Sequence, residues 1–264
     1  MCRFLAYQGE PIFLETLVCA SEHSLVHQSL HAAECKTATN GDGFGIGWYG
    51  ERDIPGLFRD LRPAWSDENL RSVCTQVRSG QFFAHVRAAT GTVTSRANCH
   101  PFAHGRWMFM HNGQIGGYTQ IKRRLEAALP DEFYHARQGT TDSEVLFLLA
   151  LAEIAKGSPP PEAVAATLGF TKMLMRDASV DEALRFTAAL TDGETLYCFR
   201  VACDDRPASL YFSEQPGAVT VASEPVDRGG DHWQAVPRGA FITVRRGTAT
   251  TVAPFPWAAE AVAA

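Results

Sequence analysis

The chain has 264 residues, of which 45% are hydrophobic and 20% are charged, a composition typical of a protein that buries a full core. Its formal net charge of -5 provides no basic field for nucleic acid or an anionic membrane, and no apolar run approaches the ~20 residues of a membrane-spanning helix. We therefore expect a cytoplasmic protein that acts on a small molecule and keeps its seven cysteines reduced.

The N-terminal sequence, MCRFLAYQGE, places a cysteine directly after the initiator methionine and contains no secretion leader. Removal of Met1, which is common when the next residue is small, would leave Cys2 with a thiol and a free α-amine. A cysteine thiol has an ordinary pKa of about 8.5 and needs a base, and an α-amine that titrates near 7.7–8.0 can act as one. The alternative is that a cysteine at this position is fortuitous.

The first third of the chain is rich in predicted β-strands, at 2–7, 43–50, 81–90 and 106–113. The strand at 81–90 ends in AHVRAAT, which places Arg87 and Thr90 at its exit. The Arg87 guanidinium could hold a substrate carboxylate in a bidentate pair, with the Thr90 hydroxyl adding a hydrogen bond. The alternative is an arginine on an edge strand that forms a surface salt bridge.

The segment FMHNGQIGGY follows the predicted strand at 106–113. Asn-Gly between apolar residues favours a hairpin, but a helical pattern follows and makes a simple hairpin doubtful. A turn that leaves a strand can instead present the Asn112 amide and the Gly113 N–H side by side. Two such donors could stabilise a developing oxyanion.

Helical periodicity begins at Tyr118. It predicts one helix that ends near Pro130, a second over 145–154, and a third over 162–176 after the turn GSPPP. Thr141 and Glu144 have the spacing of a capping box at the start of the second helix. Asp142 lies between them, where it could cap the helix or hold a substrate ammonium.

The last third returns to short strands. They are predicted in a hairpin that turns at Asp192-Gly193 and in the segments 210–214, 218–225, 241–247 and 248–255. The order of strands, helices and strands, with little βαβ alternation, predicts an α+β fold of mainly antiparallel sheets.

Several motifs together resemble a known family. Cys2, HVRAAT, HNG and TDSE, in this order, resemble the class II glutamine amidotransferases, which are N-terminal nucleophile hydrolases with a four-layer αββα fold. NGDGFGIGWY, NCHPF and ASEP are similar to the stand-alone branch related to the YafJ and ergothioneine-pathway γ-glutamyl hydrolases. The resemblance covers nearly the whole chain, and implies a single domain over 2–264, with Met1 removed and no synthase or acceptor domain.

The resemblance also implies roles for seven residues. Cys2 would be the nucleophile with its α-amine as base, and Asn112 with the Gly113 N–H would form the oxyanion hole. Arg87 and Thr90 would hold the α-carboxylate of glutamine, and Asp142 its α-ammonium. His100 would support the substrate site.

Four soft ligands lie four residues apart at His23, His27, His31 and Cys35, a spacing that on a helix would suit zinc. The alternatives are surface histidines, or a flap or wall near the substrate, which the resemblance favours. We expect no metal and no cofactor, and the role of these four residues stays open.

The resemblance predicts an amidohydrolase that cleaves the γ-amide of glutamine or a γ-glutamyl compound through a thioester on Cys2. The alternatives are a glutaminase subunit that delivers ammonia to a separate acceptor enzyme, a non-catalytic protein that binds γ-glutamyl ligands, and a metal-binding or redox module. The leaving group and the oligomeric state, including a homo-oligomer, are not determined by the sequence.

Overall fold

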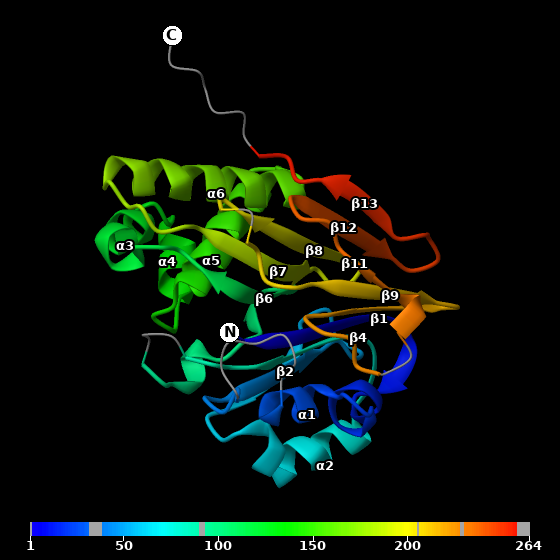
Figure 1. Cartoon of the computed structure of the whole chain (residues 1–264). Helices are drawn as coiled ribbons and strands as arrows, with labels where there is room; N and C mark the ends of the chain where they lie inside the picture. The colour runs from blue at the N-terminus through cyan, green and yellow to red at the C-terminus, as the bar shows by residue number, and fades with distance from the viewer. Residues whose placement is uncertain (1, 32–38, 90–92, 205, 228–229, 258–264) are drawn as a thin grey trace.

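The computed structural model describes residues 2–31, 39–89, 93–204, 206–227 and 230–257. Within them the strands form two antiparallel sheets that lie face to face, with helices on both outer faces (Figure 1). The predicted four-layer αββα fold is therefore confirmed. Among these residues no helix is both long and apolar enough to cross a membrane.

The first sheet contains the N-terminal strand near its centre. Its strands are, in spatial order, β11 (Trp233–Ala235), β9 (Tyr211–Gln215), β10 (Ala218–Ala222), β1 (Arg3–Phe13), β4 (Arg78–Val86), β2 (Phe44–Trp48) and β3 (Gly56–Asp60). Strand β1 thus lies between β10, which is more than 200 positions later in the chain, and β4. Helices α1 (Leu25–Leu30) and α2 (Glu68–Gln76) cover its outer face (Figure 1).

The second sheet is built from the middle and the C-terminal part of the chain. Its strands are, in spatial order, β13 (Thr251–Pro254), β12 (Ala240–Arg245), β8 (Thr195–Ala202), β7 (Arg185–Thr191), β6 (Trp107–Gln114) and β5 (Phe102–His104). Its outer face is covered by α3 (Tyr118–Ala127), α4 (Asp131–Ala136), α5 (Asp142–Ala155) and α6 (Pro160–Asp177) (Figure 1).

Three apolar layers hold these four layers together. Phe4, Phe83 and Met110 belong to the cluster between the two sheets. Their strand neighbours point the other way, so that Leu5 packs under α1 and α2 while Phe109 stacks on Phe147 of α5 with ring centroids 5.3 Å apart. Because both faces of the central strands are buried, apolar residues follow one another directly in short runs such as 4–7 of β1 and 82–84 of β4.

The predicted helices and strands are largely confirmed, with different ends. The strand expected over 81–90 begins at Arg78 and ends at Val86, and the second predicted helix begins at Asp142. The sequence reasoning missed α1, α2, α4, β3, β5 and β11, which have three to nine residues each. For α2 a signal was present, since Asp67 accepts a hydrogen bond from the Leu70 N–H at 2.6 Å as an N-cap.

The expected turn at Asn112-Gly113 is wrong. Both residues lie inside β6, where they pair with Thr187 and Phe186 of β7. The chain turns later, at Gly117, whose φ of 59° is in the left-handed region that favours glycine. Pairing along β7 extends the strand past the Asn-Gly signal, because the next strand offers hydrogen-bond partners as far as Gln114.

A glycine of β2 allows the segment that carries His100 to lie directly against the sheet. A Cβ on Gly45 would collide with the backbone carbonyl of His100, whereas Gly50, just beyond the strand, has open space around it. The absence of a side chain at position 45 therefore sets how closely the 98–101 segment approaches β2.

We predict that Gly45→Ala lowers the free energy of unfolding by about 1–3 kcal/mol, because the added methyl group meets backbone that cannot move away cheaply. Urea unfolding followed by circular dichroism measures the change. Gly50→Ala is the matched control and should stay within about 0.5 kcal/mol of wild type, as expected for an open surface position. Equal stabilities for the two variants would contradict the close packing at Gly45.

Candidate active site

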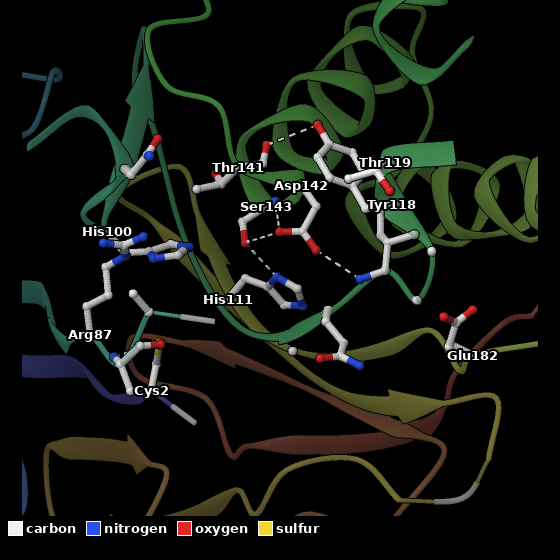
Figure 2. Close-up of a pocket in the computed structure, with 18 residues that line it drawn as sticks. Cys2, Arg87, His100, His111, Tyr118, Thr119, Thr141, Asp142, Ser143 and Glu182 are labelled. Carbon is white, nitrogen blue, oxygen red and sulfur yellow. Dashed lines mark hydrogen bonds between the residues drawn. The ribbon is translucent and has the colours of Figure 1, made fainter. Parts of the chain in front are cut away.

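A pocket of about 450 Å³ lies where β1 begins and β4 and β6 end (Figure 2). Five of the seven residues predicted from the sequence line it, namely Cys2, Arg87, His100, Gly113 and Asp142. The other lining residues are Ala88, Ala89, Asn98, His111, Gln114, Ile115, Gly116, Gly117, Tyr118, Thr119, Thr141, Ser143 and Glu182.

Cys2 lies at the bottom of this pocket, just before the first residue of β1. The last pair of the β1–β4 ladder is Arg3 with Val86, so Cys2 lies beside the segment that follows β4. Its Sγ is 3.5 Å from the backbone nitrogen of Ala88 and 3.6 Å from the Ala88 carbonyl oxygen. The thiol is partly exposed and faces the pocket (Figure 2).

Arg87 lies one residue beyond β4 and is 4% exposed. Strand β4 lies between β1 and β2, so the alternative of a surface arginine on an edge strand is wrong. The Arg87 N–H donates to the Gly43 carbonyl at 2.9 Å, and the Ala89 N–H donates to the Asp42 carboxylate at 2.7 Å. Asp42 and Gly43, just before β2, therefore fix the backbone at Arg87 and Ala89. Thr90 lies outside the described residues.

Asn112 and Gly113 lie on opposite faces of β6. Gly113 lines the pocket, and a Cβ there would collide with the Arg185 carbonyl and the His111 ring. Asn112 is two residues after Met110, so it lies on the same face of β6 and points into the space between the sheets, toward β1. It is 2% exposed, and its Nδ2 has no hydrogen-bond partner among the residues that the structure describes.

Asp142 begins α5, and its carboxylate is held by two backbone donors. The Ile115 N–H donates to Oδ2 at 2.9 Å, and the N–H of Ser143 donates to Oδ1 at 2.8 Å. Thr141 is the N-cap, since its hydroxyl accepts from the Glu144 N–H at 3.2 Å. Asp142 is therefore free of the capping role, and Figure 2 shows its carboxylate at the upper wall of the pocket.

The Glu144 side chain does not complete a capping box. Instead its two carboxylate oxygens accept from the N–H groups of Gln138 and Gly139 at 2.9 and 2.7 Å. Asn98 joins the same loop, because its side-chain oxygen accepts from the Thr140 N–H at 2.8 Å. These bonds tie the loop before Asp142 to the segment that carries His100.

His111 is a pocket residue that the sequence reasoning missed. Its Nε2 lies 3.2 Å from the Arg185 carbonyl and its Nδ1 lies 2.8 Å from the Ser143 hydroxyl. A carbonyl only accepts, so Nε2 carries the proton and Nδ1 accepts from Ser143. Burial lowers the pKa of His111, in accord with this neutral form. The HNG motif contains a signal for this residue, because His111 directly precedes Asn112 and Gly113.

Two further buried histidines lie next to Arg87. The rings of His85 and His100 have centroids 4.3 Å apart, and neither ring nitrogen of His100 has a hydrogen-bond partner in the described part of the chain. Burial, and then the Arg87 charge, lowers the pKa of His85 to about 3. Burial also lowers the pKa of His100 well below its ordinary value, with His85 as the next cause. Both rings are therefore neutral at pH 7.

The site thus combines a thiol, a guanidinium and a carboxylate in one pocket. Arg87 and Cys2 lie at one side and Asp142 lies across from them (Figure 2). A ligand with one carboxylate and one ammonium group matches this arrangement.

The histidines of the 23–35 segment lie elsewhere. His23, His27 and His31 form a row with ring centroids 5.4 and 5.8 Å apart, and Cys35 lies outside the described residues. The lining of the pocket includes none of the three histidines. In the described ranges no group of three His, Cys, Asp or Glu residues has a metal-binding arrangement.

Comparison with known proteins gives the family. Residues 16–211 match the family described as "Glutamine amidotransferases class-II". The probable glutamine amidotransferase DUG3 of Saccharomyces cerevisiae is 34% identical over 94% of this chain and 83% of its own length. The chain belongs to the class II glutamine amidotransferases. It is therefore an enzyme.

Other class II glutamine amidotransferases and relatives match along most of the chain. The γ-glutamyl-hercynylcysteine sulfoxide hydrolase of Mycolicibacterium smegmatis is 27% identical over 93% of this chain and 96% of that protein. A solved class II domain protein from Silicibacter pomeroyi has a TM-score of 0.76 at 38% identity, covering 96% of this chain and 99% of that one. The Bacillus subtilis glutamine phosphoribosylpyrophosphate amidotransferase, at 16% identity and a TM-score of 0.65, covers 96% of this chain and 49% of that one and shows the fold alone.

The buried histidines of this amidotransferase predict a pH-dependent stability. Their folded pKa values lie below the ordinary value of about 6.5, so below that pH the unfolded chain binds more protons than the folded one. The contribution of these histidines to the free energy of unfolding is therefore complete above pH 6.5. It is lost as the pH falls toward about 3, the folded pKa of His85. Each such histidine contributes a slope of up to about 1.4 kcal/mol per pH unit.

We predict that His85→Phe, which keeps a ring at this position, flattens the dependence between pH 6.5 and 5 by about that slope. Urea unfolding at several pH values, for wild type and variant, measures it. An unchanged slope would mean that His85 takes up its proton in the folded protein as readily as in the unfolded one.

Proposed function

We propose that the enzyme hydrolyses the γ-amide bond of glutamine or a γ-glutamyl compound through a thioester on Cys2, and releases glutamate. The observation that carries the proposal is the pocket in which the Cys2 thiol lies together with the Arg87 cation and the Asp142 anion. The amino-acid head of such a substrate needs one cation and one anion at a fixed separation. Its γ-carbonyl then lies near sulfur.

Arg87 binds the α-carboxylate, and Thr90 adds a hydrogen bond to it. Asp142 binds the α-ammonium, for which its carboxylate keeps lone pairs beyond those used by Ile115 and Ser143. His100 lies against His85 beside Arg87 and provides a neutral wall, so that no second cation competes for the carboxylate. The Ser143 N–H holds the Asp142 carboxylate, and the Ser143 hydroxyl in turn donates to His111.

The first chemical step is attack by sulfur. With Met1 removed, the α-amine of Cys2 takes the thiol proton, and the thiolate adds to the γ-carbonyl carbon. The resulting oxyanion accepts hydrogen bonds from the Asn112 amide and the Gly113 N–H. The C–N bond then breaks, the α-ammonium returns its proton to the leaving amine, and the glutamyl group remains on sulfur as a thioester.

Water completes the reaction. The α-amine takes a proton from the attacking water, a second oxyanion forms at the same position, and the C–S bond breaks. The α-ammonium then returns this proton to sulfur, which leaves glutamate, the Cys2 thiol and the free α-amine. The Cys2 α-amine, the Asn112 amide and the Gly113 N–H act in both the formation and the hydrolysis of the thioester. The proposed reaction requires no metal or cofactor.

The environment of Asn112 supports its place in this scheme. Its side chain is buried, faces the sheet that contains β1, and has an Nδ2 donor without a partner among the described residues. Burying an unsatisfied donor costs about 1–3 kcal/mol in a folded protein, a cost that a catalytic use of the donor explains.

The size of the pocket supports a substrate larger than glutamine. Its volume of about 450 Å³ is within the range of roughly 300–1,000 Å³ typical of small-molecule sites, and glutamine is small for it. Tyr118, Thr119 and Glu182 line the far part and leave polar room for a further group. The relative from Mycolicibacterium smegmatis is by name a hydrolase of a γ-glutamyl compound, which supports the same substrate class.

We predict that the isolated protein releases glutamate from at least one γ-glutamyl amine, peptide or thio-amino acid with a higher kcat/KM than from glutamine. Binding of the larger leaving group helps to position the carbonyl against sulfur. Cys2→Ala should abolish release, and Cys203→Ala, at an exposed cysteine, is the matched control and should not change it. Intact mass spectrometry of the active protein should show that Met1 is absent.

Two outcomes would contradict this prediction. Glutamate release by Cys2→Ala, or an active protein that retains Met1, would remove the proposed nucleophile or its base. A wide preference for glutamine, or activity only after a second protein is added, would favour a glutaminase subunit that delivers ammonia to a separate acceptor enzyme.

We predict that Asn112→Ala lowers kcat by about 10²–10³-fold, or roughly 2.7–4 kcal/mol, with little change in KM. An oxyanion donor acts on charge that is present only in the transition state. The melting temperature should not fall, because the variant loses a donor that has no partner among the described residues. Steady-state kinetics and thermal unfolding measure the two effects.

Asp142→Asn is the comparison for Asn112→Ala. It removes the charge that binds the substrate ammonium, so it should raise KM with a smaller effect on kcat. A variant of Asn112 that behaved in the same way would place this side chain in binding and not in the oxyanion hole.

A further inference from the structure

A buried ion pair lies directly behind the cysteine, outside the pocket lining. Arg3 is 0% exposed and Glu224 is 1% exposed, and Arg3 Nε lies 2.6 Å from the Glu224 carboxylate. Arg3 alternates with Phe4, which faces the other sheet, so the guanidinium is on the side of β1 covered by α1. Nothing in the proposed reaction uses this pair.

The pair forms where β10 separates from β1. The regular ladder between these strands ends at Leu5 with Ala222. Beyond it, the Phe4 N–H donates to the Ser223 hydroxyl at 3.0 Å, and the Ser223 N–H donates to the Phe4 carbonyl at 3.0 Å. Ser223 and Glu224 belong to the ASEP motif, whose contacts are thus made with the first residues of the chain.

Arg3 connects this segment to the backbone of the cysteine. Its Nη1 donates to the Cys2 carbonyl oxygen at 3.2 Å. Cys2 lies beyond the last pair of the β1–β4 ladder, so regular sheet pairing does not extend to it. The guanidinium therefore joins the residue before the ladder to a carboxylate that is fixed inside the protein.

Glu224 is in turn held from the helical layer. His23 Nε2 lies 3.2 Å from the second carboxylate oxygen, and the Gln28 side chain donates to the backbone carbonyls of His23 and Glu224 at 2.9 and 3.4 Å. Gln28 is 0% exposed and belongs to α1. Arg3 therefore contacts one oxygen of the Glu224 carboxylate and His23 contacts the other, which fixes the position of the carboxylate.

We propose that the buried Arg3–Glu224 pair is a positioning device for the nucleophile, which fixes the Cys2 backbone so that the thiol meets the substrate carbonyl and the α-amine can take the thiol proton. Neither residue touches the substrate. The proposal deepens the function proposed above and rests on Cys2 as the nucleophile. It assigns the ASEP segment a part in turnover and no part in recognition of the amino-acid head.

Stabilisation of the fold does not by itself explain why a buried ion pair lies at this place. Two buried charges lose their hydration, and well-packed apolar residues of similar volume often replace such a pair without loss of stability. Fixed geometry at the nucleophile is a sufficient reason, because a displacement of about 1 Å can lower a rate by about 100-fold.

The test uses two variants of the full chain. Glu224→Gln keeps the shape and removes the charge, and the double variant Arg3→Met/Glu224→Leu replaces both ions with apolar side chains. Asp177→Asn is the control, because it breaks the Arg124–Asp177 ion pair, which is 3.0 Å long and lies on the outer helices. For each protein we would measure kcat and KM on the best γ-glutamyl amide, the Kd of glutamate by calorimetry, and the melting temperature.

We expect both variants to lose about 10- to 100-fold in kcat while the Kd of glutamate stays within about twofold, because Arg87 and Asp142 are untouched. The double variant should keep a melting temperature close to wild type. Asp177→Asn should keep wild-type kcat.

Three results would overturn the proposal. One is a folded double variant with wild-type kcat. Another is a loss of glutamate affinity as large as the loss of kcat, which would mean a general disturbance of the pocket. The third is failure of both variants to fold, which would make the pair a structural element.

Failure of the proposed function would look different. A wild-type protein that released no glutamate from any γ-glutamyl amide would contradict the reaction and not the positioning. The readout would then be the rate at which a diazo-ketone analogue of glutamine labels Cys2, which should fall in both variants and not in Asp177→Asn. Equal labelling rates in all proteins would overturn the positioning role.

Discussion

The pairing of β1 with β4 is the interaction on which the site depends. Its last pair, Arg3 with Val86, sets the cysteine that precedes β1 beside the residues that follow β4. Because both strands are buried on both faces, a shift of one residue would turn Phe4 and Leu5 to the wrong layers and disrupt the packing of both cores. The register is therefore fixed by the cores, and the place of the thiol next to Arg87 follows from it.

The chemistry of the pocket depends on which groups are charged. Arg87 and Asp142 carry opposite charges, while His85, His100 and His111 are kept neutral by burial. Three cationic imidazoles near Arg87 would attract any carboxylate and would weaken the discrimination of an amino-acid head from other anions. Neutral rings leave one cation and one anion, and a zwitterionic head is the ligand that matches both.

Two kinds of buried polar group surround this pocket. Asn112 has a donor without a described partner and faces the space between the sheets, as a group used only in a transition state would. Arg3 and Glu224 are instead paired with each other and with the Cys2 backbone and His23. The unpartnered donor of Asn112 fits a group that acts on the reacting atoms. The paired side chains of Arg3 and Glu224 fit groups that act by holding another residue in place.

The sequence by itself determined the coarse succession of strands, helices and strands, the thiol at position 2, and the residue types that could hold an amino-acid head. Periodicity, capping by Thr141 and motif spacing are local properties. Only the tertiary structure decided that Asn112 lies in a strand and not in a turn, since that depends on pairing with β7. It alone brought Ser143 to His111 and Glu224 to Arg3. The partners of the last pair are more than 200 positions apart in the chain, and no local pattern encodes which distant carboxylate meets a buried guanidinium.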